Sequence, residues 1–122
     1  MNYIKTYESY SGKDILDTIS DILLDANDDG FDAVVKSASG HNRYILLIVK
    51  RIGVNGHQNF DYNDVKDVIE RSLDYLKSNG VIPMELTNDR IIEIYVGVWL
   101  PLYANMYKKD QIRGARIIFT LS

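Results

Sequence analysis

The sharpest chemical pattern in the sequence is an acidic stretch, residues 25–30 (DANDDG), which matches the start of the calcium-loop pattern. Its aspartate and asparagine side chains fall at the first, third and fifth positions of the loop, and its glycine falls at the sixth. Such a loop needs a glutamate at the twelfth position to complete the oxygen shell around the cation. Here the twelfth position is Lys36, and the eighth, which is normally apolar, is Asp32. The stretch therefore predicts an acidic helix end, and we expect no metal there.

The other candidates for catalysis lack the partners that catalysis needs. His41 and His57 fall in predicted turns, with no second histidine at helical spacing and no cysteine anywhere in the chain. Carboxylate pairs such as Asp14 and Asp17 fall in the first turns of predicted helices, where the helix dipole favours acids. No nucleophile elbow, phosphate-binding loop or dinucleotide-binding glycine pattern occurs. The sequence therefore predicts a protein that is not an enzyme and that has no cofactor.

Aromatic and basic residues gather near the end of the chain. Residues 103–114 combine tyrosines, a methionine and bases in a connection of above-average length, which is the composition of a contact surface. Tyrosine suits such a surface because it combines a large apolar ring with a polar tip, although Tyr44 and Tyr95 also fit ordinary half-exposed positions on a sheet. The predicted interaction surface comprises Tyr95, Trp99, Tyr103, Met106, Tyr107, Lys108, Lys109 and Arg113.

Charge is distributed unevenly along the chain. Residues 8–32 carry eight acids and one base, a net charge of −7, whereas residues 108–122 carry a net charge of +3. The whole chain has a net charge of −3, which argues against a general nucleic-acid-binding protein. The first predicted helix has an acidic outer face, which is either simply solvated or able to mimic a row of phosphates against a basic groove. This acidic face comprises Asp14, Asp17, Asp21 and Asp25.

Apolar spacing and turn residues divide the chain into helices and strands. One helix is expected to begin at Ser11 and end at Gly30, and a second is expected to begin at Asp61 and end at Gly80. A glycine-rich loop is expected at residues 53–59. The predicted strands cover residues 31–38, 43–52, 81–87, 90–100 and 115–121, of which 43–52 is apolar on both faces and 81–87 contains a proline that confines it to an edge.

The two halves of the chain share a pattern at an offset of 50 residues. Gly30 aligns with Gly80 without a gap, and residues 11–52 and 61–100 both read as a helix followed by two strands. Matching helix ends favour duplication over two helices that happen to share a periodicity.

The sequence length and composition predict one domain, because 122 residues with 46% apolar content cannot form two separate cores. We predict an α+β fold over residues 1–122, in which two α-β-β repeats and a final strand form an antiparallel sheet with both helices on one face. That arrangement is a ferredoxin-like sandwich or a permuted variant of one.

The N-terminal segment Tyr3-Ile4-Lys5-Thr6-Tyr7-Glu8-Ser9-Tyr10 resembles the Lys-Thr-Tyr-x-x-aromatic segment of small accessory and internal proteins of large tailed bacteriophages. In some of those proteins the segment directs packaging into the prohead and is then cleaved, but the segment here has no Ile-x-Glu or Leu-x-Glu processing site. The resemblance implies a phage-encoded protein. The alternative is an N-terminal strand or arm in which Tyr3, Ile4 and Tyr7 pack on the core.

These observations predict a small non-enzymatic protein-binding module, either a phage accessory protein or an inhibitor of a host function. One alternative is nucleic-acid or nucleotide binding through an aromatic sheet face and the basic loop, and another is a virion-associated structural protein. No apolar run approaches the ~20 residues that span a bilayer, and no secretory signal is present, so a cytoplasmic protein is expected. The nucleotide-binding alternative would use Tyr44, Tyr95, Trp99, Lys108, Lys109 and Arg113.

The last strand predicts a homodimer. Residues 116–121 form an apolar run, and as an exposed sheet edge such a run needs a cover. In the long predicted strand 90–100, strict alternation places Ile92, Ile94, Val96 and Val98 on the face toward the helices. Tyr95 and Trp99 then project from the opposite face, where a second copy would bury them.

Overall fold

The computed structural model describes residues 3–40, 42–52, 56–81, 83–84, 91–102 and 112–121, with side chains described from residue 13 onward. The described residues form two α-helices, α1 (Tyr3–Asp28) and α2 (Lys66–Ser78), and a short 3-10 helix, η1 (Tyr62–Asp64). They also form the strands β1 (Phe31–Ser37), β2 (Arg43–Ile52), β3 (Gly56–Gln58), β4 (Glu93–Tyr95), β5 (Trp99–Pro101) and β6 (Gly114–Thr120).

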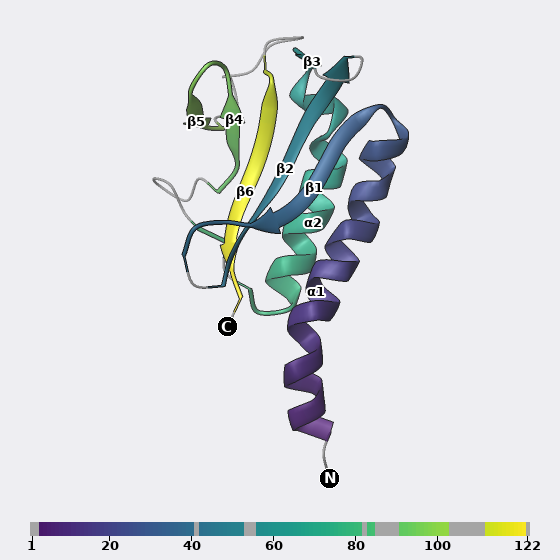
Figure 1. The fold of residues 1–122 in the computed structure, drawn as a ribbon, viewed down its shortest axis with the longest axis vertical. Coiled ribbons are helices and arrows are strands. Elements are labelled where there is room, and N and C mark those ends of the chain that lie inside the picture. The colour runs from purple at the N-terminus through teal and green to yellow at the C-terminus, as the bar shows by residue number, and fades with distance from the viewer. Residues whose placement is uncertain are drawn as a thin grey trace.

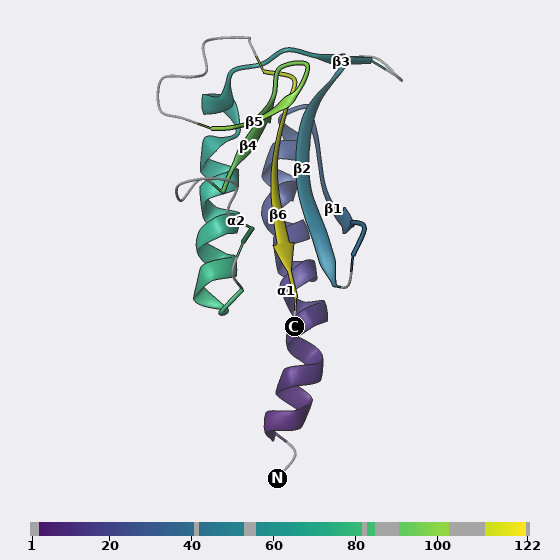
Figure 2. The ribbon, with the colours of Figure 1, turned by 90° about the vertical axis from the view of Figure 1, so that its left-hand side faces the viewer.

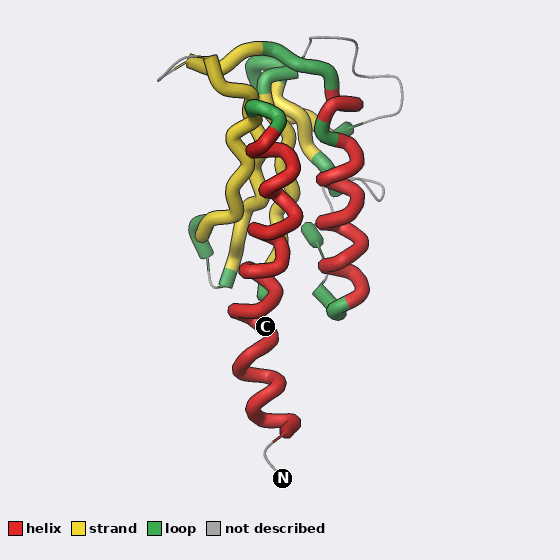
Figure 3. Tube along the Cα trace, turned by 90° about the vertical axis from the view of Figure 1, so that its right-hand side faces the viewer, coloured by secondary structure: helices red, strands yellow, loops and turns green. Residues whose placement is uncertain are grey.

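The strands form one antiparallel sheet in the order β1-β2-β6-β4-β5, with β3 paired to the end of β2. Both helices cover the same face of this sheet and lie side by side, as Figures 1 and 3 show. The predicted α+β class with two helices on one face is therefore confirmed. The chain order is that of a ferredoxin-like β-α-β-β-α-β unit whose first strand has moved to the end of the chain.

The first helix is longer than predicted. It begins at Tyr3, so the expected start at Ser11 is wrong, and so is the alternative of an N-terminal strand, because the backbone of residues 3–10 is helical. The side chains of Tyr3, Ile4 and Tyr7 lie outside the described part of the chain. Adding turns to an existing helix avoids the cost of nucleation, and the segment contains no proline to stop it. Its N-terminal turns extend past the end of the sheet (Figure 1).

The ends of both helices follow the predicted turn chemistry. Gly30 and Gly80 adopt φ values of +92° and +75°, the left-handed conformation that a glycine tolerates without strain. At the start of the second helical segment, Asp61 accepts a hydrogen bond from the backbone N–H of Asn63 at 3.0 Å and so caps η1. The two glycines and the Asp61 cap were predicted correctly from the sequence because each depends on only a few adjacent residues.

The core lies between the sheet and the helix pair. Leu46 and Ile48 of β2 and alternate residues of β6 face the helices and are fully buried there. Tyr44 is half-buried on this side, where its ring stacks on Phe119 with 5.9 Å between ring centroids. Tyr44 therefore does not contribute to an aromatic outer face of the sheet. The largest fully buried aliphatic side chains among the described residues are Ile19, Leu23, Leu46, Ile48, Ile69, Leu76, Ile94, Ile112 and Ile117.

The long strand predicted for residues 90–100 is wrong. The chain reverses at Gly97, which has a φ of +104°, and β4 pairs with β5 in a hairpin. Val96 and Val98 lie at the hairpin tip, 43% and 58% exposed, and do not face the core as expected. The long strand was predicted because β-branched residues alternate on both sides of Gly97. Gly97 itself was the one residue in this stretch that indicated a turn.

The last strand is not an edge. It covers residues 114–120, close to the predicted 115–121, but β6 pairs with β2 on one side and with β4 on the other (Figure 2). The reasoning that a bare C-terminal edge requires a dimer is therefore wrong, because β6 already has two neighbours. Among the described strands, β1 and β5 lie at the two ends of this order, and β3 pairs with β2 alone.

The two predicted repeats pair their strands differently. β1 pairs with β2 along seven residues, whereas β4 pairs with β5 and β6. Of the predicted strand 81–87, the described part contributes an isolated bridge between Pro83 and Phe119, and residues 82 and 85–87 lie outside the described residues. The halves therefore share helix ends without sharing a strand arrangement.

Candidate functional site

The sheet has one face that the helices do not cover, which we call the outer face. Because Leu46 and Ile48 point toward the helices and are fully buried, their neighbours on β2 must point the other way. The register of the sheet places the side chains of adjacent strands beside them. The apolar residues of the outer face are Val34, Ile45, Leu47, Val49, Tyr95, Trp99 and Ile118, all half-buried except Val34, which is 41% exposed.

The hairpin of β4 and β5 supplies the aromatic end of the outer face. Tyr95 and Trp99 are paired in register, and their rings lie 5.1 Å apart with an angle of 50° between the planes. The indole extends over β6, where a Cβ added to Gly114 would lie 3.4 Å from its Cη2 atom. Gly114 therefore leaves just enough room for the indole to lie on the strand.

A buried ion pair fixes the position of the indole. The Nε–H of Arg116 donates to Glu93 Oε1 at 2.7 Å, and the Glu93 residue is only 8% exposed. The guanidinium of Arg116 also lies over the Trp99 ring, 4.0 Å from its centroid. The Glu93 carboxylate lies on the sheet surface and is buried because the hairpin covers it. The charge of Arg116 offsets the cost of burying that carboxylate.

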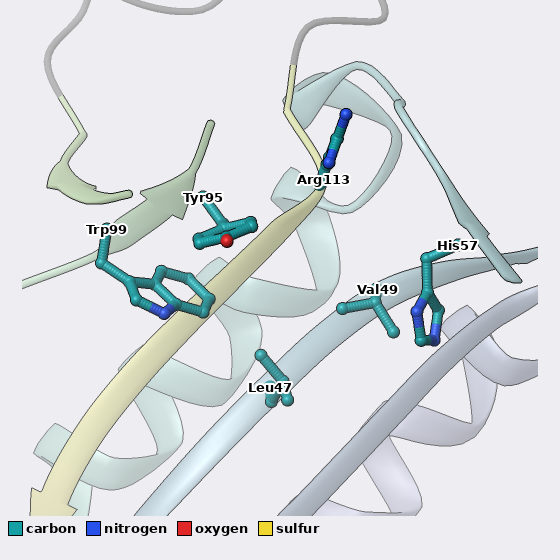
Figure 4. A pocket seen from close by; sticks show the side chains of 6 residues that line it. All are labelled: Leu47, Val49, His57, Tyr95, Trp99 and Arg113. Carbon is teal, nitrogen blue, oxygen red and sulfur yellow. The ribbon is translucent and has the colours of Figure 1, made fainter. Parts of the chain in front are cut away.

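A depression of about 520 Å³ lies on the outer face between the hairpin and β3. Figure 4 shows the side chains of Leu47 and Val49 projecting between the two aromatic rings and the imidazole of His57. Arg113 lies at the rim, where its backbone N–H donates to the carbonyl of Tyr95 at 2.8 Å. The arginine side chain donates through Nε to Asn59 Oδ1 at 3.2 Å and is otherwise exposed.

The structure brings together three residues of the predicted interaction surface. Tyr95, Trp99 and Arg113 line the same depression. The other predicted members, Tyr103, Met106, Tyr107, Lys108 and Lys109, lie outside the described residues.

Sequence reasoning missed the other side chains that line the depression. Residues 43–52 were predicted to be apolar on both faces, and β2 does lie inside the sheet, between β1 and β6. That pattern was not taken to indicate a site, although Leu47 and Val49 of its outer face line the depression. His57 was placed in a turn, whereas it lies in β3. Strand β3 was not predicted because Gly56 is typical of a loop. A Cβ at Gly56 would lie 2.9 Å from the carbonyl oxygen of Ile52, so the pairing requires glycine there.

The predicted acidic face is only partly available. Asp17 and Asp21 are exposed and Asp14 is half-buried, but Asp25 pairs with Arg71 of α2, with 2.6 Å between its Oδ2 and the guanidinium Nη2. Arg71 also pairs with Asp67 at 3.0 Å. The hydrogen bond from Arg71 to Asp25 raises the pKa of the guanidinium above its ordinary value, which is already far above physiological pH.

The calcium-like stretch has a structural use. The Asn27 side chain accepts from the backbone N–H of Ala33 at 2.9 Å and donates to the Ala33 carbonyl at 3.1 Å. It also donates to the Leu23 carbonyl at 3.2 Å, so it links the end of α1 to the edge of β1. Among the described residues, no three histidine, cysteine or carboxylate side chains lie close enough to hold a metal.

The two faces of the molecule differ in charge. On the outer face the register places the bases Lys36, Arg43, Arg51 and Arg116 together with the acids Asp32 and Glu93, and Arg113 adds a further positive charge at the rim. The described parts of the helices instead carry most of the acids. No described helix has the length and apolar character required to cross a membrane.

Comparison of the chain with protein-family models gives no match, and a search of curated proteins finds no similar sequence. Functional inference therefore starts from the outer face itself.

Proposed function

We propose that this protein is a non-enzymatic binding module that recognises a partner protein through the outer face of its sheet. The observation that carries the proposal is the apolar surface of β1, β2 and β6, which no described helix covers and which the aromatic side chains of the β4–β5 hairpin extend. Two helices can cover only one face of a sheet, so an apolar opposite face needs another cover.

The charges around the outer face indicate which charges the surface of the partner should carry. Glu93 is neutralised by Arg116, and Asp32 by Arg51 at 3.3 Å. Among the described residues, Lys36, Arg43 and Arg113 are then the cations whose charge the acids of this face do not offset. The matching surface is apolar in its centre and carries carboxylates at its rim. The helical layer, being acidic, would repel the same partner.

The aromatic end is suited to supply most of the binding energy. Tryptophan, tyrosine and arginine are the side chains most often found at energetic centres of interfaces. Trp99 is already held by Arg116, so little side-chain entropy is lost when it is buried. Together with the N-terminal resemblance, this supports a phage accessory protein or an inhibitor that binds a protein of the bacterial host.

A matched pair of charge substitutions tests the proposal. Val34→Glu places a carboxylate on the outer face and Leu24→Glu places one on α1, both at exposed positions where the charge stays solvated. The wild-type chain and both variants serve as baits in a bacterial host extract. A partner that the wild-type chain and Leu24→Glu retain, and that Val34→Glu loses, supports the proposal. Equal retention by both variants overturns it.

A second copy of the chain is the competing occupant of the outer face. Light scattering of the purified chain separates the two. A homodimer through this face would give the mass of two chains for the wild type and for Leu24→Glu, and the mass of one chain for Val34→Glu. That result would overturn the proposal that a different protein binds the outer face. The mass of one chain leaves the face open for that partner.

A further inference from the structure

Beyond the protein-binding function, we infer that the depression beside the hairpin is a binding site for a planar aromatic ring that carries a phosphate, as a nucleotide does. Its volume of about 520 Å³ falls within the range of ~300–1,000 Å³ typical of small-ligand sites. Its lining also has the composition of such a site, with apolar and aromatic walls and a few polar groups at the mouth.

The aromatic side of the depression suits a planar ring. The rings of Tyr95 and Trp99 stand on one side of it, and Leu47 and Val49 form an aliphatic floor (Figure 4). Arg116 holds the indole at 4.0 Å and is itself held by Glu93, so the aromatic wall is positioned before any ligand enters. A nucleobase can stack on such a wall, because every base presents a flat π-face to an aromatic side chain.

The rim of the depression suits an anion. None of the six described lining residues carries a carboxylate, and Arg113 brings a permanent positive charge. Within the described residues its guanidinium donates only through Nε to Asn59, which leaves the terminal nitrogens facing solvent as phosphate donors. His57 adds a further hydrogen-bonding ring on the opposite side. Ring and phosphate would thus be recognised by separate parts of the site.

The chain contains a single tryptophan, which is Trp99, so its fluorescence reports directly on this depression. Titration with adenosine monophosphate is expected to change the emission in a saturable manner. Adenosine alone and orthophosphate alone should each bind at least about tenfold more weakly, because each lacks one of the two recognised groups. The affinity of an oligodeoxyadenylate per site is then compared with that of adenosine monophosphate. An equal or lower affinity identifies a free nucleotide as the ligand, and a higher affinity identifies a single-stranded nucleic acid. No response to either the nucleotide or the oligonucleotide overturns the inference.

Two arginine variants separate a built site from general attraction to positive charge. Arg113→Gln removes the rim charge and is expected to weaken nucleotide binding about tenfold, the loss of one charge-assisted hydrogen bond. Arg51→Gln is the matched control, since Arg51 is an exposed arginine on the same face that does not line the depression. Equal losses in both variants would show non-specific attraction and overturn the site. Binding by these variants does not depend on whether a protein partner exists.

Discussion

Replacing Glu93 with alanine tests the central physical claim about the hairpin, namely that a buried ion pair fixes the indole on the sheet. The substitution removes the acceptor of a 2.7 Å hydrogen bond and leaves the Arg116 charge with its side chain only 22% exposed. At an effective dielectric constant of about 20, two charges about 4 Å apart attract by about 4 kcal/mol. Much of that attraction offsets the desolvation of both groups.

Breaking a buried pair by removing one partner costs about 3–5 kcal/mol. Arg116 keeps some exposure and its contact with Trp99, so we expect Glu93→Ala to lower the free energy of unfolding by about 3 kcal/mol. Glu93→Gln, which keeps an acceptor, should lower it by about 1.5 kcal/mol. The double variant Glu93→Ala, Arg116→Ala should cost about 2 kcal/mol less than the sum of the two single variants.

Urea unfolding followed by circular dichroism and by Trp99 emission measures these free energies by linear extrapolation. The exposed pair of Asp32 and Arg51 is the control, since its side chains are 41% and 52% exposed and its coupling should be below about 1 kcal/mol. Added salt should weaken the control coupling and leave the Glu93–Arg116 coupling nearly unchanged. A Glu93–Arg116 coupling no larger than that of the control would refute the reasoning.

Three further substitutions test the fold that carries the site, each by urea unfolding. Ile48→Ala leaves a cavity in the fully buried core and should lower the free energy of unfolding by about 3 kcal/mol. Val34→Ala on the outer face should lower it by less than about 1 kcal/mol. Equal costs would contradict the assignment of the two faces. Asn27→Ala removes the amide that links α1 to β1 and should cost about 2 kcal/mol, with faster hydrogen exchange at the Ala33 amide as its local sign. Gly97→Ala forces a Cβ into a φ of +104° and should cost about 1–2 kcal/mol; an unchanged midpoint would exclude the hairpin turn.

The sequence alone was sufficient for features that depend on neighbouring residues. The inner faces of both helices follow from apolar spacing, and the helix ends follow from Gly30 and Gly80, because a left-handed turn is a local steric requirement. Tyr95 and Trp99 were predicted on the helix-free face and lie there, although a hairpin rather than one long strand puts them on it.

Only the tertiary structure decided which strands are neighbours. β6 lies between β2 and β4, although β2 and β6 are separated in sequence by an entire helix and hairpin, and no local pattern records that pairing. The depression depends on it, since Arg113 precedes β6 while Leu47 and Val49 come from β2. Likewise, Asn27 matched a metal-ligand pattern in sequence, but the edge of β1 lies beside it in the fold and takes up its hydrogen bonds. Local spacing determines which face of an element is apolar, whereas strand order depends on contacts between distant segments that form only when the whole core packs.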